Sequence, residues 1–295
     1  MRVLLLDGTY ELFRHHFGIP AEARATSTTG GTRGVIGSIL DLLDEGATHL
    51  GVATDHVIES FRNDLWPGYK TSAGMDPLIL GQFGLLEEAV TALGVHVWAM
   101  TELEADDALG SAAAVASDDP TVEQVRILTP DKDLAQCVVG KRVVQVDRRK
   151  QFVTDEAGVW EKFGVAPESI PDLLALVGDS ADGFPGLPGW GAKSAAAVLA
   201  RYRHIDAIPD AAGQWEVTIR GAPKLAAVLA AGREAAALFL ELATLRIDRS
   251  LLAAGSDSLR WRGPTSDFAA VCEQLDAPHL ARRADNIAAG RAGTR

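Results

Sequence analysis

The 295-residue sequence lacks the patterns of cysteine and of long apolar runs that identify disulfide-rich, secreted and membrane proteins. Its two cysteines, Cys137 and Cys272, lie far apart and lack metal-ligand spacing, so we expect free thiols in a reducing compartment. No apolar run approaches the ~20 residues that a membrane-spanning helix needs. The apolar run at residues 3–6 ends at Asp7 and is too short for the core of a signal peptide. We therefore expect a cytoplasmic protein with no membrane partner.

The sequence also lacks the excess of positive charge that is typical of nucleic-acid-binding proteins. Its 40 acidic and 28 basic residues give a net charge of −12. Nine of the acids gather in five short clusters, and the other 31 nearly balance the 28 bases. The charge therefore does not exclude a DNA partner. It predicts that contact with DNA is local and depends on bound metal.

Most of the nine clustered acids lie where a predicted strand stops. In an open α/β sheet the carboxyl ends of the strands share one edge, where ligands bind. Carboxylates that converge there would repel one another unless hard cations such as Mg²⁺ or Mn²⁺ bound between them. This arrangement predicts a metal-dependent enzyme acting on phosphate esters. The nine are Asp7, Asp55, Glu104, Asp106, Asp107, Asp131, Asp133, Asp179 and Asp182.

The order of apolar patterns predicts an α/β fold with a mostly parallel central sheet flanked by helices. Short buried strands are expected at residues 3–6, 50–53, 95–98, 125–128 and 142–146, and helices at 35–43, 78–93 and 106–116. Helical patterns dominate from about residue 167. We therefore expect a catalytic domain over residues 1–165 and a helical DNA-binding region over 166–295. The last residues, from about 284, are expected to fray.

Two pairs of acids have i, i+2 spacing, namely Asp131 with Asp133 and Glu104 with Asp106. In extended backbone such residues point to the same face, so both carboxylates of a pair can reach one site. Asp107 stands at the expected start of a helix, where an acid can serve simply as a cap. Taken alone, each cluster is most simply explained as surface charge or as helix capping. Five clusters at strand ends favour a metal site.

A Gly- and Pro-rich stretch at residues 185–193 follows Asp179 and Asp182, whose spacing of three suits one face of a turn. Its glycines allow backbone N–H groups to face a phosphate. They are Gly186, Gly189 and Gly191. A nucleotide-binding P-loop is excluded because Lys193 comes one place late and no strand precedes the stretch, so no nucleotide cofactor is expected. A helix-hairpin-helix element that grips duplex backbone without reading sequence fits better.

Five motifs in this order resemble the bacterial 5′-3′ exonuclease and flap endonuclease family, which includes the 5′-nuclease domain of bacterial DNA polymerase I. The resemblance covers roughly residues 1–250. No polymerase sequence follows, so a stand-alone form is expected. The motifs are Asp7-Gly8-Thr9 with Phe13-Arg14, Phe61-Arg62 with Pro67-Gly68-Tyr69-Lys70, Glu104-Ala105-Asp106-Asp107, Asp131-Lys132-Asp133-Leu134, and Gly178-Asp179-Ser180-Ala181-Asp182 continuing through Pro185 to Lys193.

The resemblance implies a structure-selective 5′-nuclease that hydrolyses DNA at flaps, gaps and 5′ ends during replication and repair. It implies two Mg²⁺ or Mn²⁺ ions, a K⁺ ion at the Gly-rich hairpin, and a monomer associated with the nucleoid. One metal site would use Asp7, Asp55, Glu104 and Asp106, the second Asp131, Asp133, Asp179 and Asp182, with Asp107 near both.

The resemblance also implies roles for residues outside the acidic clusters. Lys70 and Arg14 would act at the scissile phosphate, Tyr69 would stack on an unpaired base, and Arg62 and Lys193 would contact DNA, as would the hairpin glycines. A helical arch is expected at about residues 70–93. Residues 71–92 contain no Lys or Arg, which departs from the family pattern and predicts weak electrostatic capture of a free 5′ strand.

Three other functions remain open on the sequence alone. Leu6-Asp7-Gly8-Thr9 resembles the start of a haloacid dehalogenase-type phosphatase, but position 9 is Thr where that chemistry needs a second acid. A PIN-like RNase would share the acidic sheet edge but would normally lack the Gly-rich duplex grip. A non-catalytic DNA-binding protein would be expected to have lost metal ligands, whereas all nine acids are present.

Overall fold

The computed structural model describes residues 1–292, which form two compact units. Within the described residues, unit 1 consists of Met1–Ile58, Ser72–Thr129 and residues 247–292, and unit 2 of Glu59–Thr71 and Pro130–Arg246. The chain therefore passes between the units several times. The domain boundary expected near residue 165 falls inside unit 2 and stays a prediction.

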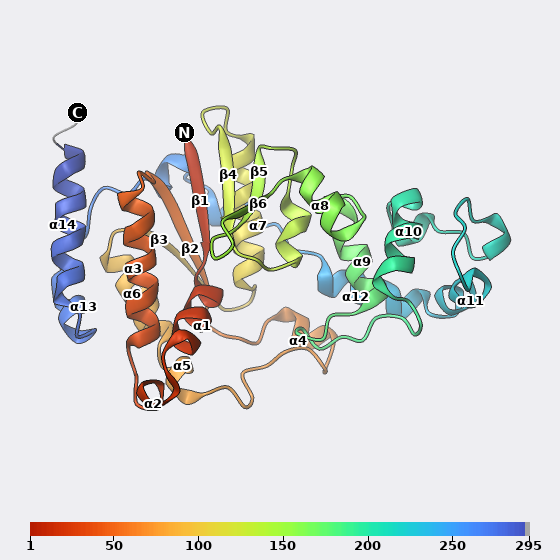
Figure 1. The fold of residues 1–295 in the computed structure, drawn as a ribbon, viewed down its shortest axis with the longest axis horizontal. Coiled ribbons are helices and arrows are strands. Elements are labelled where there is room, and N and C mark those ends of the chain that lie inside the picture. Colours follow the sequence, from red (N-terminus) through yellow and green to blue (C-terminus); the bar gives the residue numbers. More distant parts are fainter. Residues whose placement is uncertain (293–295) are drawn as a thin grey trace. The chain divides into compact units, whose positions relative to one another are not determined.

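Unit 1 is built on four parallel strands in the order β3-β2-β1-β4 (Figure 1). They are β1 (Arg2–Asp7), β2 (His49–Asp55), β3 (His96–Met100) and β4 (Gln124–Leu128). Leu4 pairs with Leu50 on one side and Arg126 on the other. The apolar runs are buried on both faces of the sheet, as expected of parallel strands covered by helices. The predicted α/β class is confirmed.

Helices cover these strands because each presents an apolar stripe. The stripe of α3 is fully buried and consists of Val35, Ile36, Ile39, Leu40 and Leu43. Helix α7 contacts all four strands, and α6 contacts β2 and β3. No helix among residues 1–292 is long and apolar enough to cross a bilayer. The main helices of unit 1 are α1 (Gly8–Gly18), α2 (Ala21–Arg24), α3 (Gly30–Asp44), α5 (Pro77–Leu80), α6 (Phe83–Ala92), α7 (Ala105–Asp118), α13 (Phe268–Gln274) and α14 (Pro278–Ala292).

The single helix predicted over residues 78–93 is two helices, α5 and α6, which separate at Gly81 and Gln82. The Gln82 side chain is fully buried, where Oε1 accepts from Thr32 N (3.1 Å) and Nε2 donates to Leu78 O (2.9 Å). The first bond satisfies a backbone N–H in the first turn of α3, and the second satisfies a carbonyl of α5 just before the break. Helix α6 packs on β3, α3 and α13, so this part of the predicted arch belongs to the packed layer.

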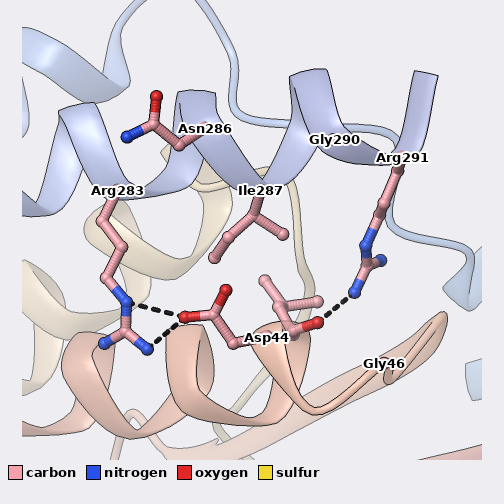
Figure 2. A pocket seen from close by; sticks show the side chains of 8 residues that line it. Asp44, Gly46, Arg283, Asn286, Ile287, Gly290 and Arg291 are labelled. Carbon is pink, nitrogen blue, oxygen red and sulfur yellow. Dashed lines mark hydrogen bonds and ion pairs between the residues drawn. The ribbon is translucent and has the colours of Figure 1, made fainter. Parts of the chain in front are cut away.

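The C-terminal helices α13 and α14 are packed against unit 1, and the prediction of fraying from residue 284 is wrong for the described residues. Helix α14 lies on α3, with Ala284 and Ile287 buried. Figure 2 shows the groove beside this contact, in which Arg283 donates to Asp44 (3.0 Å) and Arg291 reaches the carboxyl end of α3. Buried apolar side chains and the two arginine contacts hold this end of the chain on α3.

Unit 2 has an antiparallel strand pair, β5 (Val143–Asp147) and β6 (Phe152–Thr154), followed by helices. The strand β6 was not predicted, because its three residues carry no clear alternation. Helices dominate after residue 167, as predicted. They surround a core that includes Phe184, Trp190 and Phe239. The elements are α4 (Phe61–Leu65), η1 (Asp133–Cys137), α8 (Glu156–Phe163), η2 (Pro167–Ser169), α9 (Ile170–Val177), α10 (Ala192–Tyr202), η3 (Ile205–Ala207), η4 (Ala212–Gln214), α11 (Ala222–Ala231) and α12 (Arg233–Ala243).

Candidate active site

Two acids stand at the carboxyl edge of the unit 1 sheet. Asp7 and Asp55 are the last residues of β1 and β2, as predicted. The buried Asp7 carboxylate accepts from Tyr10 N at the start of α1 and from Thr129 Oγ1, both at 2.8 Å. Parallel pairing of β1 with β2 places both acids at the same edge.

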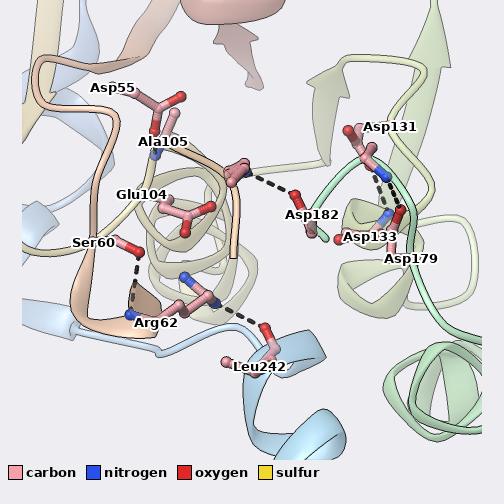
Figure 3. Close-up of polar contacts among 12 residues, drawn as sticks. Asp55, Ser60, Arg62, Glu104, Ala105, Asp131, Asp133, Asp179, Asp182 and Leu242 are labelled. Carbon is pink, nitrogen blue, oxygen red and sulfur yellow. Dashed lines mark hydrogen bonds and ion pairs between the residues drawn. The ribbon is translucent and has the colours of Figure 1, made fainter. Parts of the chain in front are cut away.

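The other acids of unit 1 surround the first turn of α7. Asp55 Oδ1 accepts from Ala105 N (2.7 Å), as Figure 3 shows. Glu104 is the N-cap of α7, and Asp107 Oδ2 accepts from Glu104 N (2.9 Å). The positive end of the helix dipole stabilises these carboxylates. Asp107 is fully buried and does act as a cap, while Asp106 is partly exposed. Metal binding by these acids stays a prediction.

In unit 2 four acids form what we call the carboxylate cluster: Asp131, Asp133, Asp179 and Asp182. One carboxylate oxygen from each of Asp133, Asp179 and Asp182 lies within 4.8 Å of the others, and all three residues are buried. Asp133 Oδ1 is buried without a hydrogen-bond partner among the described residues. A buried carboxylate oxygen left unsatisfied beside two further carboxylates suits a hard divalent cation. The residues present therefore fit a metal ion.

The backbone that carries Asp131 and Asp133 differs from the extended form expected. Lys132 has helical dihedrals (φ −67°, ψ −26°), and Asp133 begins the short 3-10 helix η1. Asp133 N donates to Asp131 Oδ1 (3.0 Å), so the first acid closes a turn around the second. The i, i+2 argument fails here because an Asp side chain readily caps its own backbone two residues later.

The pKa of Asp133 lies well above its ordinary value. Burial is the main cause, and the negative charges of Asp131, Asp182 and Asp179 add to it. Two lysines oppose this negative charge. Lys70 Nζ lies 3.0 Å from Asp182 Oδ1, and Lys132 Nζ forms an ion pair with Asp179. Figure 3 labels the four acids of the cluster.

The segment 59–71 holds Lys70 in this position. Asn63 Nδ2 donates to Lys70 O (3.0 Å), and Lys70 N donates to Asp182 O (3.0 Å). Ser60 and Asn63 form a capping box at the start of α4. The predicted residue Lys70 is therefore brought to the carboxylate cluster by both its backbone and its side chain.

Arg62 and Tyr69 are placed differently from the other predicted DNA contacts. Arg62 is only 2% exposed, and its guanidinium donates to Leu242 O (2.8 Å) and Thr244 O (3.2 Å) at the end of α12 (Figure 3). Tyr69 is 3% exposed within the core of unit 2. Contact of either side chain with DNA stays a prediction and would require it to leave this packing.

The Gly-rich stretch connects α9 to α10, and its glycines serve different purposes. Gly186 is buried with φ +67°, and a Cβ there would lie 2.3 Å from Gly178 N. It is needed for close backbone packing. Gly189 and Gly191 are exposed next to the N-terminus of α10, as is Lys193. These three, rather than Gly186, are placed where a phosphate could approach.

We expect Gly186→Ala to lower the free energy of unfolding by about 2–3 kcal/mol, because the added Cβ meets backbone and the residue has positive φ. Gly191→Ala is the matched control: its φ is −125° and a Cβ would have nothing within 4 Å. Chemical denaturation of both variants measures the difference. Equal stability of the two variants would contradict the conclusion that Gly186 is needed for backbone packing and Gly191 is not.

Arg14 projects from α1 toward α3. Its guanidinium donates to Glu11 through Nε (3.0 Å) and Nη2 (2.6 Å), and to Ser38 Oγ (3.2 Å). The bond to Glu11 is the main cause of a raised pKa for Arg14. The side chain is about one-third exposed, so part of it can meet a ligand. Its catalytic role stays a prediction.

Sequence reasoning missed several residues that hold the acids or Lys70 in place. Thr9 Oγ1 accepts from Asp55 N (2.9 Å), and Thr129 and Asn63 make the bonds described above. Lys132, inside the D-x-D motif, was not given a role. A signal was present for Thr9 and Thr129, since each lies within two residues of a predicted metal ligand and carries a hydroxyl group.

Two family models match the chain in succession. The model described as 5′-3′ exonuclease, N-terminal resolvase-like domain matches residues 2–164, and that described as 5′-3′ exonuclease, C-terminal SAM fold matches residues 165–267. DNA polymerase I of Pseudomonas aeruginosa is 36% identical over 262 residues, which cover 84% of this chain. The match spans only 28% of the length of that polymerase.

Solved structures share the fold at low identity. The T5 D15 protein co-crystallised with metal ions has a TM-score of 0.66 at 18% identity, with 95% of this chain and all of that chain covered. The catalytic core of Rad2 in complex with a DNA substrate has a TM-score of 0.62 at 16% identity, with 97% and 92% covered. These likenesses establish the architecture.

Proposed function

Because this chain belongs to the family of 5′-3′ exonucleases and flap endonucleases, which are metal-dependent nucleases, we propose that it cleaves DNA at 5′ flaps, gaps and 5′ ends. Replication and repair are the processes that produce such ends. The observation that carries the proposal is the carboxylate cluster, with its unsatisfied buried Asp133 oxygen. A buried group of acids without cations would be costly, so the cluster is best explained by metal binding.

We propose Mg²⁺ or Mn²⁺ as the resident ions, since both prefer oxygen ligands. Bound divalent ions would activate a water and stabilise charge on the scissile phosphate. One ion would be held in unit 1 and another by the carboxylate cluster of unit 2. The first set is Asp7, Asp55, Glu104 and Asp106, with Asp107 holding the backbone of Glu104 in place.

Lys70 is proposed to neutralise charge that develops on the phosphate, with Arg14 as a second cation. The ion pair between Lys70 and Asp182, one of the proposed metal ligands, supports this role. An ammonium beside the metal ligands can bind a phosphate oxygen without rearrangement of the chain. Tyr69 is proposed to stack on a base only after it leaves its buried position.

The hairpin between α9 and α10 is proposed to grip one strand of duplex DNA. Gly189 and Gly191 are exposed residues without side chains, so a phosphate can approach the backbone there, and the exposed Lys193 adds a positive charge without base specificity. A K⁺ ion between the hairpin and a phosphate is part of the proposal. The proposal also includes a monomeric state and a location in the cytoplasm with the nucleoid.

A substrate comparison tests this function against an RNase. The purified protein would be incubated with Mn²⁺ or Mg²⁺ and a labelled double-flap DNA, a gapped DNA, or a single-stranded RNA. We expect cleavage of the two DNA substrates and no cleavage in EDTA. Cleavage of the RNA in preference to the flap would contradict the duplex-gripping role of the hairpin and favour a PIN-like RNase.

The absence of Lys and Arg from residues 71–92 predicts a weak response to flap length. Electrostatic capture of a free strand needs cations along its path, and its strength falls with added salt. We expect the cleavage rate to change less than about three-fold between short and long flaps at any salt concentration. Strong stimulation by long flaps that salt abolishes would contradict a weakly cationic arch.

A further inference from the structure

Lys132 is the feature of the carboxylate cluster that the proposed function leaves unexplained. Its ammonium group pairs with Asp179, one of the three buried acids whose oxygens lie within 4.8 Å of one another. Lys70 pairs with Asp182 at the same cluster. Lys132 and Lys70 thus each pair with one acid of the cluster. The Asp133 Oδ1 oxygen is buried and has no hydrogen-bond partner among the described residues.

Lys132 lies between two acids of the cluster in sequence and forms an ion pair with a third, Asp179. The side chain of Lys132 is 38% exposed, which leaves the ammonium a path to water. Lys132 can therefore move off Asp179 without being buried elsewhere.

A lysine and a divalent cation compete for the same carboxylate. The Asp179 oxygen that pairs with Lys132 lies among the acids that fit a metal. A metal ion bound to Asp179 would replace the ammonium as the partner of that carboxylate. The ion would also repel the ammonium, since charges a few ångströms apart interact strongly at a partly buried site. Both effects oppose metal binding.

We propose that Lys132 is an internal counter-ion of the carboxylate cluster, which occupies Asp179 in the metal-free protein and sets the affinity of the cluster for divalent cations. This inference rests on the proposed metal binding. The counter-ion limits repulsion among the acids before metal arrives, so the unit folds without a cation. The same ammonium weakens the binding of each ion that must displace it.

The test is calorimetric titration of Mn²⁺ into metal-free wild type, Lys132→Met and Lys132→Arg, with thermal unfolding in EDTA. Lys132→Met should bind Mn²⁺ at least about ten-fold more tightly, because the substitution removes one positive charge that repels the ion at a partly buried site. Its melting temperature in EDTA should fall, and the rise on adding Mn²⁺ should exceed that of wild type. Lys132→Arg should bind like wild type, since it keeps the charge.

Lys224→Met is the matched control, because Lys224 is an exposed lysine on α11 of the same unit. Its Mn²⁺ affinity should equal that of wild type. Unchanged or weaker Mn²⁺ binding by Lys132→Met would overturn the counter-ion role while leaving the nuclease proposal in place. Absence of Mn²⁺ binding in every protein tested would overturn both.

Discussion

Replacing Asp133 with asparagine is expected to lower metal-dependent DNA cleavage by about a thousand-fold and to stabilise the metal-free protein. The cleavage loss follows from removal of a buried metal ligand, since a metal supplies several kcal/mol of transition-state stabilisation and about 4 kcal/mol is a thousand-fold in rate. The gain in stability follows from removal of a carboxyl group that burial and three neighbouring acids disfavour in its ionised form.

The stability difference should depend on pH. Folding raises the pKa of Asp133. The contribution of Asp133 to the free energy of unfolding is therefore most favourable below the pKa that its carboxyl group has in the unfolded chain, about 4. Stability is then lost as the pH rises from there through the raised pKa of the folded protein. Asparagine does not titrate. The stabilisation of Asp133→Asn relative to wild type should therefore be small at pH 4 and grow toward neutral pH.

Thermal unfolding in EDTA across this pH range, together with cleavage assays in Mn²⁺, measures both effects. Asp206→Asn makes the same chemical change at an exposed position of unit 2 outside the carboxylate cluster and should alter neither. A less stable Asp133→Asn at neutral pH would show that Asp133 is stabilised by contacts within the metal-free protein. Retained cleavage would exclude Asp133 as a ligand.

Replacing Arg62 with alanine is expected to lower the free energy of unfolding by about 3–5 kcal/mol. The buried guanidinium donates two charge-assisted hydrogen bonds to Leu242 O and Thr244 O, and such bonds contribute about 1.5–3 kcal/mol each. These carbonyls lie at the end of α12, where the helix leaves acceptors unsatisfied. Lysine should restore only part of the loss, because it lacks the planar fork.

The same variant separates a structural role from contact with DNA. A residue that neutralises a phosphate changes the slope of log K against log salt by about one when it is removed. We expect Arg62→Ala to leave that slope unchanged and Lys193→Ala to reduce it without a change in stability. Equilibrium DNA binding at several salt concentrations supplies the slopes. A reduced slope with unchanged stability in Arg62→Ala would restore the DNA-contact prediction.

Much of the fold followed from the sequence because the signals are local. The continuous apolar run before Asp7 and the one before Asp55 predicted buried parallel strands, and both acids end those strands. The helical repeat over residues 35–43 lies within α3. Patterns of this kind depend only on which face of an element is buried, so they do not require knowledge of the partner element.

Features that depend on distant parts of the chain could not be predicted. The break before α6 depends on Gln82 bonding to Thr32, fifty residues away. The burial of Arg62 depends on carbonyls about 180 residues later. The turn at Asp131 depends on a side chain that accepts from the backbone two residues later, an alternative that competes with the extended form. The sequence shows the residue types but not these pairings.

The most direct test of the central claim is cleavage of a 5′-labelled double-flap DNA in Mg²⁺ or Mn²⁺ by wild type, Asp179→Asn and Asp206→Asn. We expect release of a short flap product by wild type and Asp206→Asn, none in EDTA, and loss of the product in Asp179→Asn. Flap binding without cleavage by the wild-type protein in either metal would contradict a metal-dependent 5′-nuclease and indicate a DNA-binding protein instead.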